Sequence, residues 1–359
     1  MSKYIAFYLP QFHPVPENDK WYGKGFTEWT NVAKAKPLFL GHYEPHIPGE
    51  LGFYDLRLPE TRREQAKLAM QYGIDAFCYW HYWFGNGKQI LEMPIWEVYK
   101  DKSIKLPFCL AWANHSWEKK MWDKKGGNEI ILEQRYLGEK DYSDFFYSLL
   151  PLFKDERYFK VDGRLFFAIY NPLENKDIRS LICLWRQLAI KEGIPDFYFV
   201  GKDSNFKNHS KIIDIGFDSV YEDNLLAAHH NMNVLSKVFH LIERKIFKRP
   251  TVIRYKKAIN YMVPKDYIPP NTIPVVAPNW DHSPRSGSNA IILHDCRPEY
   301  FEKLLMNTEK LMKNIPNEER IVIVKSWNEW GEGNHLEPDL KYGKGYLEAL
   351  KKIKELTNV

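Results

Sequence analysis

Eight short apolar runs recur along the 359 residues of the chain, and they leave few folds open to it. Runs of this kind, rich in Val, Ile and Phe without polar alternation, are typical of parallel strands that are buried on both faces. The predicted strands are Tyr4 to Leu9, Ile74 to Trp80, Pro107 to Ala113, Leu165 to Tyr170, Phe197 to Gly201, Phe217 to Tyr221, Ile273 to Ala277 and Ile321 to Lys325.

Amphipathic stretches typical of helices fill most of the gaps between these strands, and the chain ends on one of them. The predicted helices are Glu60 to Tyr72, Ile90 to Lys100, Lys140 to Phe153, Asp177 to Lys191, Arg297 to Lys313 and Gly345 to Leu356. Eight strand–helix units predict an α/β fold, a single (β/α)8 TIM barrel with long βα loops that forms one domain over residues 1–359. An open doubly wound sheet is the alternative, but its first strand is normally followed by a glycine-rich phosphate turn. This chain has Pro10-Gln11-Phe12-His13-Pro14 there.

Residues 222–267 form an unusually long connection, which we interpret as an insertion after the sixth strand. Within it, Val234 to Lys245 is an amphipathic stretch with several basic residues. The simpler interpretation is a helix that covers the side of the barrel. The alternative is a lid or a contact with a membrane surface.

The net charge of +5 is mild, and much of the excess lies between Lys237 and Lys257. The sequence therefore carries no general nucleic-acid footprint, although an anionic partner near that stretch, such as a membrane face, fits the charge. No apolar run approaches the roughly 20 residues of a membrane span, and no secretory signal pattern is present. The four cysteines form no C-x-x-C pair, which predicts free thiols and a cytoplasmic protein.

Polar and aromatic side chains follow most of the predicted strands, at the edge where barrel enzymes build their sites. Aromatic rings can stack on the apolar faces of a sugar while amides and carboxylates bind its hydroxyls, so the pattern predicts an oligosaccharide or polysaccharide substrate. The chain's 12 Trp, 22 Tyr and 21 Phe fit a surface that stacks flat ligands. The candidate substrate-binding residues are Tyr8, Gln11, His13, Glu28, Trp80, His81, Tyr82, Trp112, Asn114, His115, Tyr170, Asp281, Arg285, Trp327 and Asn328.

Two carboxylates, Glu329 and Glu332, follow the eighth strand three positions apart, and they are the candidate catalytic residues. Gly331 and Gly333 permit a tight turn that would bring both into the cleft. Paired carboxylates are the usual equipment for cleaving a glycosidic bond. A pair that caps the following helix is the structural alternative, and Glu337 and Asp339 lie close enough to leave the assignment within this acidic cluster open.

Glu28 and three histidines admit more than one interpretation. Glu28 is either a substrate ligand or an ion-pair partner of Lys24 or Lys34. The histidines that follow strands, His13, His81 and His115, could form a metal site, but no His-x-His or His-Glu-x-x-His pairing supports one. We therefore predict no metal and no cofactor.

Three segments of the chain resemble the WbsX-type family of bacterial polysaccharide-biosynthesis proteins. They are Ile5-Ala6-Phe7-Tyr8-Leu9-Pro10-Gln11-Phe12-His13, Lys24-Gly25-Phe26-Thr27-Glu28-Trp29-Thr30-Asn31-Val32 and Trp327-Asn328-Glu329-Trp330-Gly331-Glu332-Gly333. That family is similar to glycoside hydrolase family 99, the metal-independent endo-α-mannosidase group, whose Asn-Glu-Trp-x-Glu-Gly segment matches Asn328 to Gly333.

The resemblance implies a retaining mechanism through a 1,2-anhydro sugar. Glu329 would take the proton of the sugar 2-hydroxyl, whose oxygen attacks C1. Glu332 would protonate the leaving oxygen and later activate water. These roles require a raised pKa at Glu332 and an ionised Glu329. The resemblance extends to Asp281 and Arg285 as residues near the scissile sugar. Gly331 departs from the pattern, because the hydrolases often have histidine there.

The sequence supports three functions. The first is a retaining glycoside hydrolase or transglycosidase acting on a bacterial surface polysaccharide. The second is a glycosyltransferase of lipopolysaccharide, O-antigen or capsule biosynthesis, with peripheral contact to a membrane or a lipid-linked glycan. Transferases that use sugar nucleotides usually have open sheets and often an Asp-x-Asp motif, which this chain lacks. The third is a glycan-binding protein without catalysis, which would not need the acid pair.

Overall fold

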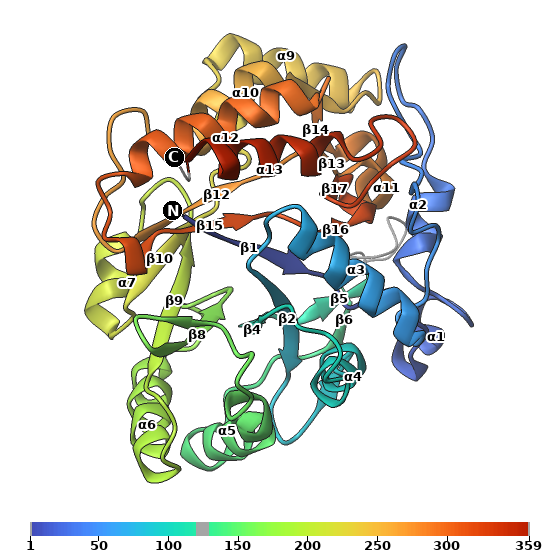
Figure 1. The fold of residues 1–359 in the computed structure, drawn as a ribbon. Helices are drawn as coiled ribbons and strands as arrows, with labels where there is room; N and C mark the ends of the chain where they lie inside the picture. Colours follow the sequence, from blue (N-terminus) through green and yellow to red (C-terminus); the bar gives the residue numbers. More distant parts are fainter. Residues whose placement is uncertain (1, 120–128, 358–359) are drawn as a thin grey trace.

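Eight parallel strands close into a barrel in the computed structural model, which describes residues 2–119 and 129–357 (Figure 1). In chain order they are β1 (Lys3–Tyr8), β2 (Ala76–Trp83), β4 (Phe108–Trp112), β8 (Arg164–Ile169), β9 (Phe197–Asp203), β10 (Ser219–Glu222), β12 (Thr272–Val276) and β15 (Ile321–Val324). Each strand pairs with its neighbours, and β1 pairs with both β2 and β15, which closes the ring. The predicted (β/α)8 TIM barrel and its eight strands are confirmed.

A helix follows each barrel strand and covers the outside of the barrel. These helices are α3 (Pro59–Gln71), α4 (Met93–Lys100), α5 (Glu139–Phe153), α6 (Ile178–Lys191), α7 (His209–Ile215), α10 (Tyr255–Met262), α12 (Pro298–Met312) and α13 (Gly345–Thr357). All but α7 and α10 were predicted, with ends that differ by a few residues. Those two span only about two helical turns, too few for a 3.6-residue periodicity to show clearly.

The long loop between β1 and α3 contains two short helices that the sequence did not reveal, α1 (Pro16–Tyr22) and α2 (Glu28–Lys34). Thr27 and Thr30 form a reciprocal capping box at the start of α2. This cap fixes Glu28 in the first helical turn, where it is fully buried.

A small second sheet joins the segment after β10 to the loop after β12. It consists of β11 (Thr251–Arg254), β14 (Ile291–His294) and β13 (Trp280–Asp281). Strand β11 belongs to the predicted insertion, while β13 and β14 flank the short helix α11 (Ser283–Ser286). Pairing between β11 and β14 therefore anchors the loop that carries Arg285.

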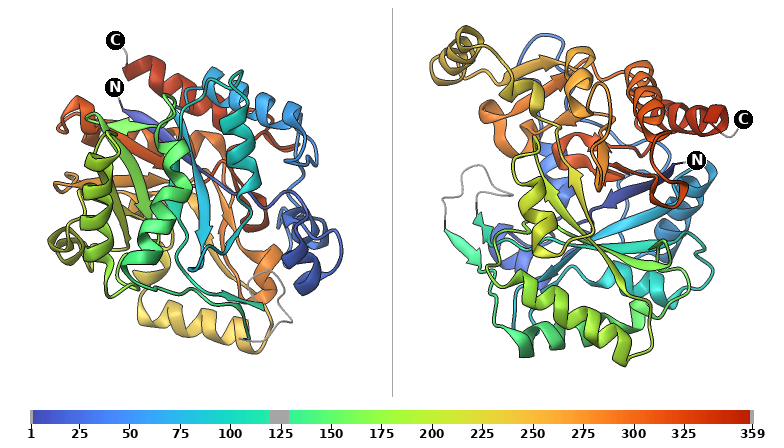
Figure 2. Two further views of the ribbon diagram at one scale, coloured as in Figure 1. Left: turned by 90° about the horizontal axis from the view of Figure 1, so that it is seen from below. Right: turned by 90° about the vertical axis from the view of Figure 1, so that its left-hand side faces the viewer.

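The remaining helices of the insertion are α8 (Ala227–His230) and α9 (Val234–Lys245), and α9 lies at the outer edge of the molecule (Figures 1 and 2). No residue of α9 is buried. The interpretation of this stretch as a helix is correct, but its role as a cover for the barrel side is wrong, because its apolar side chains face solvent.

Aromatic side chains make up much of the core between the barrel and helices α5 and α6. Trp185 on α6 is fully buried. Its ring centroid lies 4.9 Å from that of Phe167, 5.1 Å from Phe145 and 5.3 Å from Phe197. Most of the aromatic excess that we assigned to ligand stacking is therefore used in packing.

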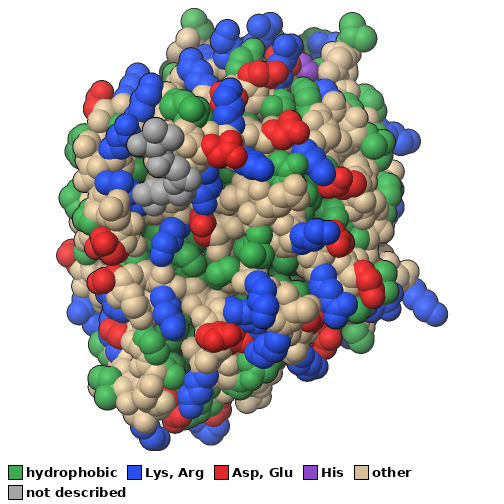
Figure 3. Space-filling view, viewed as in Figure 1, with side chains coloured by type: hydrophobic (Ala, Val, Ile, Leu, Met, Phe, Trp, Pro, Cys, Tyr) green, Lys and Arg blue, Asp and Glu red, His purple; other side chains and the backbone are tan. Residues whose placement is uncertain are grey.

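The distribution of surface charge and the state of the cysteines can be compared with the predictions of mild charge and free thiols. On the face seen in Figure 3, Lys and Arg side chains alternate with Asp and Glu. All four cysteines are free, as predicted, with Cys183 exposed. None of the helices in the described part of the chain is both long and apolar enough to cross a membrane.

Replacing Trp185 with Ala should lower the free energy of unfolding by about 3–5 kcal/mol, because it leaves a large cavity among aromatic rings. Denaturant unfolding of the purified protein measures this change. The matched control is Ile190→Ala on the same helix. Ile190 is 80% exposed, so its loss should change stability by less than about 0.5 kcal/mol. Equal effects of the two changes would contradict this account of the core.

Candidate active site

A cleft of about 690 Å³ opens at the carboxyl ends of the barrel strands. Its lining residues combine aromatic rings, two carboxylates and two cationic side chains. They are Leu9, Trp80, Tyr82, Ala113, His115, Tyr170, Trp280, Arg285, Lys325, Glu329 and Glu332. Such a mixture can hold a sugar ring by stacking and hydrogen bonding.

The two candidate catalytic carboxylates reach this cleft from a tight hairpin after β15. Glu329 ends β16 (Asn328–Glu329), Glu332 ends the short 3₁₀ helix η4 (Trp330–Glu332), and β17 (Asn334–His335) returns antiparallel to β16. Gly333 has a φ of +49° between the helix and the returning strand. This conformation favours glycine, and the bend lets both carboxylates face one cavity. They do not cap the helix that follows.

Arg285 binds two carboxylates from opposite ends of the chain. Its Nε donates to Glu28 Oε1 at 3.0 Å, and its Nη1 donates to Glu332 Oε1. His282 Nε2 lies 3.5 Å from the same Glu332 oxygen. Glu28 is therefore an ion-pair partner, but of Arg285, and the suggested pairing with Lys24 or Lys34 is wrong.

Gly331 has a steric explanation in this arrangement. A Cβ atom added there would lie 1.4 Å from Glu28 Oε1, far inside any real contact. The carboxylate of Glu28 thus fills the space in which a side chain at position 331 would stand. The glycine at position 331, which departs from the family 99 pattern, is therefore explained by the Glu28–Arg285 ion pair, because Glu28 occupies the space of a side chain there.

The pKa values of Glu329 and Glu332 are shifted in opposite directions. Burial, and next the adjacent Glu332 carboxylate, raise the pKa of Glu329 to about 8. Burial would also raise the pKa of Glu332, but Arg285 and His282 outweigh it and the pKa falls below its usual range. The roles implied by the resemblance require the reverse, a raised pKa at Glu332 and an ionised Glu329. Trp80 Nε1 donates to Glu329 Oε1 at 2.9 Å and fixes that carboxyl group.

Five of the candidate substrate-binding residues line the cleft. They are Trp80, Tyr82, His115, Tyr170 and Arg285. The rings of Trp80 and Tyr170 meet edge to face at 5.6 Å, and Lys202 Nζ lies 3.8 Å from the centroid of Tyr170. These rings form an aromatic wall of the cleft, and Trp80 within it contacts Glu329.

The other candidates are buried and do not line this cleft. Glu28 is bound in a buried ion pair with Arg285, and buried Asp281 accepts a hydrogen bond from His42. The remaining ones are Tyr8, Gln11, His13, His81, Trp112, Asn114, Trp327 and Asn328, none more than 3% exposed. Tyr8 donates to Gln65, Trp112 donates to the carbonyl of Trp83, and Asn328 both donates to and accepts from the backbone of Leu9. They shape the cleft from beneath.

Four cleft residues were not among the predicted candidates, the apolar Leu9 and Ala113 together with Trp280 and Lys325. Lys325 Nζ donates to Asp223 Oδ2 at 2.9 Å and lies 5.2 Å from the Trp280 ring centroid. Burial would lower the pKa of Lys325, but Asp223 and Glu329 outweigh it, so the amine stays cationic. The sequence signal that could have indicated Lys325 is its position, a single lysine directly after the apolar run Ile321 to Val324.

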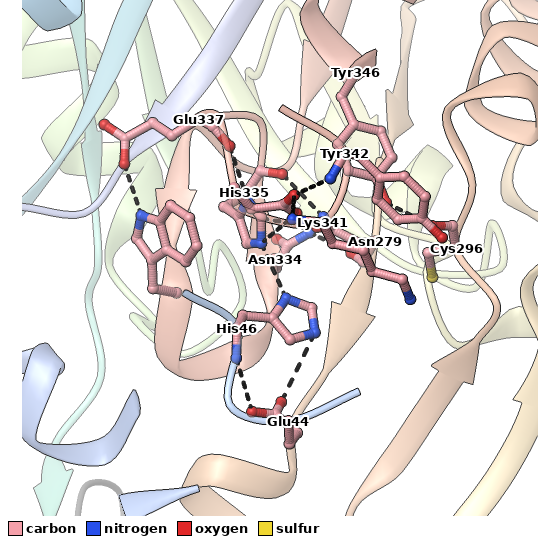
Figure 4. Close-up of polar contacts among 12 residues, drawn as sticks. Glu44, His46, Asn279, Cys296, Asn334, His335, Glu337, Lys341, Tyr342 and Tyr346 are labelled. Carbon is pink, nitrogen blue, oxygen red and sulfur yellow. Dashed lines mark hydrogen bonds and ion pairs between the residues drawn. The ribbon is translucent and has the colours of Figure 1, made fainter. Parts of the chain in front are cut away.

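A second buried polar cluster supports the site from behind (Figure 4). His335 Nδ1 donates to the carbonyl of Glu337, so its Nε2 accepts from His46 Nδ1 at 3.0 Å. The Trp330 ring stacks on His335 with centroids 3.7 Å apart. The Glu337 carboxylate accepts from Tyr54, Gln65 and Trp330. Glu337 thus holds the hairpin in place, and Glu329 and Glu332 are the members of the acidic cluster that line the cleft.

Among the described residues, His42, Glu44 and Asp281 have ligand atoms close enough to hold a metal ion, within 4.8 Å of one another. However, His42 Nδ1 accepts from the backbone N–H of Leu38, so Nε2 carries the proton and donates to Asp281. Burial, and next Asp281, raise the pKa of Glu44 to about 10. Hydrogen bonds and a bound proton therefore account for this group. His13, His81 and His115 are not gathered into a comparable cluster.

Comparison with known families gives one match over nearly the whole chain. Residues 4–350 match the family described as "Glycosyltransferase WbsX". Two strains of Xanthomonas campestris pv. campestris have an uncharacterized protein WxcX that is 37% identical over 350 residues, or 96% of this chain. The chain spans about half, 48%, of the length of these relatives.

Solved structures with similar folds include several glycoside hydrolases. A glycoside hydrolase-like protein has a TM-score of 0.63 at 13% identity and covers 98% of this chain and 93% of its own. The GH99 endo-alpha-mannosidase of Bacteroides thetaiotaomicron has a TM-score of 0.57 at 15% identity, with 98% and 96% covered. At these identities the similarity establishes the fold.

The Gly331→Ala variant should lose stability by about 1–3 kcal/mol, because Glu28 must move and Arg285 loses a buried partner. The double variant Glu28→Ala/Gly331→Ala should recover part of this loss, since the smaller residue frees the space. Chemical denaturation of the four members of this double-mutant cycle measures the coupling. Strict additivity of the two single changes would contradict the steric relation.

The two catalytic carboxyl groups should respond oppositely to replacement by Gln at about pH 8.5. A carboxyl with a raised folded-state pKa binds its proton more tightly when folded, so wild-type stability falls as the pH rises from about 4.5 to about 8. Glu329→Gln removes this loss and should raise Tm. Glu332→Gln should lower Tm, because Arg285 loses an ionised partner. Thermal melts across this pH range measure both, and the reverse signs would place the proton on Glu332.

Proposed function

The chain belongs to the WbsX glycosyltransferase family, and from this membership and its cleft we propose that it is a retaining glycoside hydrolase. The family and the similar folds support a carbohydrate-active protein. The single observation that carries the finer proposal is the placement of two adjacent carboxyl groups, the buried Glu329 and the largely covered Glu332, in one aromatic-lined cleft, with the pKa of Glu329 raised and that of Glu332 lowered. Two carboxyl groups of which one is protonated are what acid–base cleavage of a glycosidic bond requires.

We infer a bacterial surface polysaccharide as the substrate class, with a mannose-like sugar as the first to test. The solved structures of similar fold include enzymes described as endo-alpha-mannosidases, and this supports the choice of test sugar. In the proposed binding mode, Tyr170 and Trp80 stack against the sugar ring. Lys325, His115 and Tyr82 are available to its hydroxyls.

The proposed reaction has two steps and uses only carboxyl groups, without a metal or cofactor. In the first step Glu329 takes the proton from the 2-hydroxyl, O2 attacks C1, and the C1–O bond to the leaving group breaks. Glu332 gives its proton to the leaving oxygen. In the second step Glu332 takes a proton from water, the water oxygen attacks C1, the C1–O2 bond of the anhydro ring breaks, and Glu329 returns its proton to O2.

This assignment requires the proton to move between the carboxyl groups when substrate binds, because the free enzyme holds it on Glu329. A 2-hydroxyl that donates a hydrogen bond to Glu329 favours the ionised form of that carboxyl. The adjacent Glu332 is then the acceptor for the displaced proton. Trp80 already donates to Glu329 and supports its negative charge in the same way.

A glycosyltransferase is the second candidate, and the family description favours it. The same carboxyl pair could direct the sugar to an acceptor hydroxyl instead of water. The proposed roles of Glu329 and Glu332 would be unchanged if the donor were a glycoside. A nucleotide-sugar donor would need a site for a diphosphate, and the lining of the cleft does not favour one, since it contains two carboxylates.

Purified protein should release sugar from α-mannosides or a bacterial surface glycan without any nucleotide. Glu332→Gln and Glu329→Gln should each lower kcat by about 10²–10⁴-fold, the usual contribution of an acid–base group. The control is Glu348→Gln, which changes an exposed carboxylate on α13 and should leave kcat unaltered. With an activated leaving group such as 4-nitrophenol, Glu332→Gln should recover activity and Glu329→Gln should not.

Two results would count against this proposal. Nucleotide-dependent transfer that survives Glu332→Gln would reject the hydrolase and support a transferase. Recovery by Glu329→Gln, and not by Glu332→Gln, on activated substrates would keep the hydrolase and exchange the two roles.

A further inference from the structure

Helix α9 is amphipathic in the opposite sense to a normal surface helix. Its side chains that turn toward the rest of the protein are mostly polar, and Ser236, His240 and Glu243 are only partly exposed. Its large apolar side chains point outward. Val234 is 74% exposed, Leu235 81%, and Phe239 57%. A helix that packs on a core places these two faces the other way round.

The outward apolar face continues past the end of the helix. Its members share an exposed fraction above 40% and lie within one 14-residue segment. They are Val234, Leu235, Val238, Phe239, Leu241, Ile242, Ile246 and Phe247, which we call the α9 apolar face. Contiguous apolar surface of this kind is rare on a protein that meets only water, and it marks a site of contact.

Local hydrogen bonds fix the two ends of α9. Asn233 caps the helix by accepting from Ser236 N at 2.8 Å. Lys237 Nζ donates to the carbonyl of His230 at 2.8 Å, and Arg249 N donates to the carbonyl of Glu243. The helix also contacts β11, which belongs to the second sheet. The helix thus meets the second sheet through β11, while its large apolar side chains stay exposed.

Basic residues surround the α9 apolar face. Between positions 231 and 250 there are five of them, Lys237, Arg244, Lys245, Lys248 and Arg249, and a single acidic residue, Glu243. In Figure 3, Lys and Arg side chains and hydrophobic ones crowd the upper edge, where Figure 1 places α9 and α10. A second copy of the chain docked face to face would bring the two basic rims together, which disfavours self-association.

We propose that the α9 apolar face docks on an anionic lipid surface. Its large apolar side chains enter the boundary between headgroups and acyl chains, and the basic rim binds anionic headgroups. Apolar area and positive charge reinforce each other in this mode of binding. The proposal does not depend on the chemistry of the cleft.

The position of α9 adds a consequence for the substrate, which rests on the proposed function. The two views of Figure 2 place α9 on the side of the barrel away from the N-terminus of β1, the side to which the strands' carboxyl ends point. His230, next to α9, lines a neighbouring pocket together with Lys202 and Tyr170, and Tyr170 also lines the catalytic cleft. Docking through α9 therefore holds the cleft near the membrane, where a lipid-linked glycan would reach it.

Vesicle co-sedimentation of the full chain tests the docking. The protein should bind vesicles of phosphatidylcholine mixed with phosphatidylglycerol, and should bind pure phosphatidylcholine much less. Raising the salt concentration from about 0.1 M to about 1 M should release it, as the Debye length shrinks from about 10 Å to about 3 Å. Absence of binding to the anionic vesicles would overturn the proposal.

Matched variants separate the α9 apolar face from general stickiness. Leu235→Glu with Phe239→Glu should abolish binding, while Leu40→Glu with Ile190→Glu should not, although Leu40 and Ile190 are fully and 80% exposed. Lys245→Glu with Lys248→Glu should weaken binding by about fivefold or more per residue, the effect of about 1 kcal/mol for each basic group. Lys67→Glu with Lys140→Glu is the charge control, since both are highly exposed.

Two further outcomes would overturn the proposal. The first is binding that the α9 changes leave intact. The second is a concentration-dependent dimer, seen by sedimentation velocity, that Leu235→Glu with Phe239→Glu dissociates, because the occupant would then be a second copy. Thermal melts check that each variant is folded. Loss of vesicle binding with unchanged hydrolysis of a soluble substrate, or the reverse, distinguishes this proposal from the proposed function.

Discussion

The guanidinium of Arg285 joins two loops that are far apart in the sequence, because it binds Glu28 from the first long loop and Glu332 from the last. Much of the site depends on this contact. It keeps Glu332 ionised, and the pair of carboxylates then retains its one proton on Glu329. It also explains Gly331, whose missing side chain leaves room for Glu28. A buried arginine with two carboxylate partners is costly to break, so the arrangement is stable once formed.

The surrounding polar network explains why many polar residues near the site are buried and not open to substrate. Asn328 ties the catalytic hairpin to the backbone of Leu9, and Glu337 ties it to Tyr54 and Gln65. Each contact joins the end of β15 to the first third of the chain. A catalytic group is held in position only when its neighbours are fixed as well, and these residues provide that support.

The sequence predicted the barrel and the position of Glu329 and Glu332 in one cleft because both leave local signals. Apolar runs reveal buried strands wherever they occur, and the two acids lie on either side of Trp330 and Gly331, with Gly333 directly after them. The sequence did not predict the Arg285–Glu28 pair, since its partners are 257 positions apart and nothing local couples them. Nor could it distinguish Trp80, which lines the cleft, from Trp112, which packs beneath it. Both follow barrel strands, and only the direction of the side chain separates them.

Helix α9 is a second case in which the sequence does not reveal the direction of the side chains. Its periodicity predicted an amphipathic helix correctly, but periodicity gives the angle between two faces and not which of them points inward. The inward face was assigned by the usual assumption that apolar side chains seek the core. Here no residue of α9 is buried, its partly covered side chains include Ser236, His240 and Glu243, and its large apolar side chains are exposed. The apolar face is consequently left for an external partner, and the basic residues around it favour an anionic one.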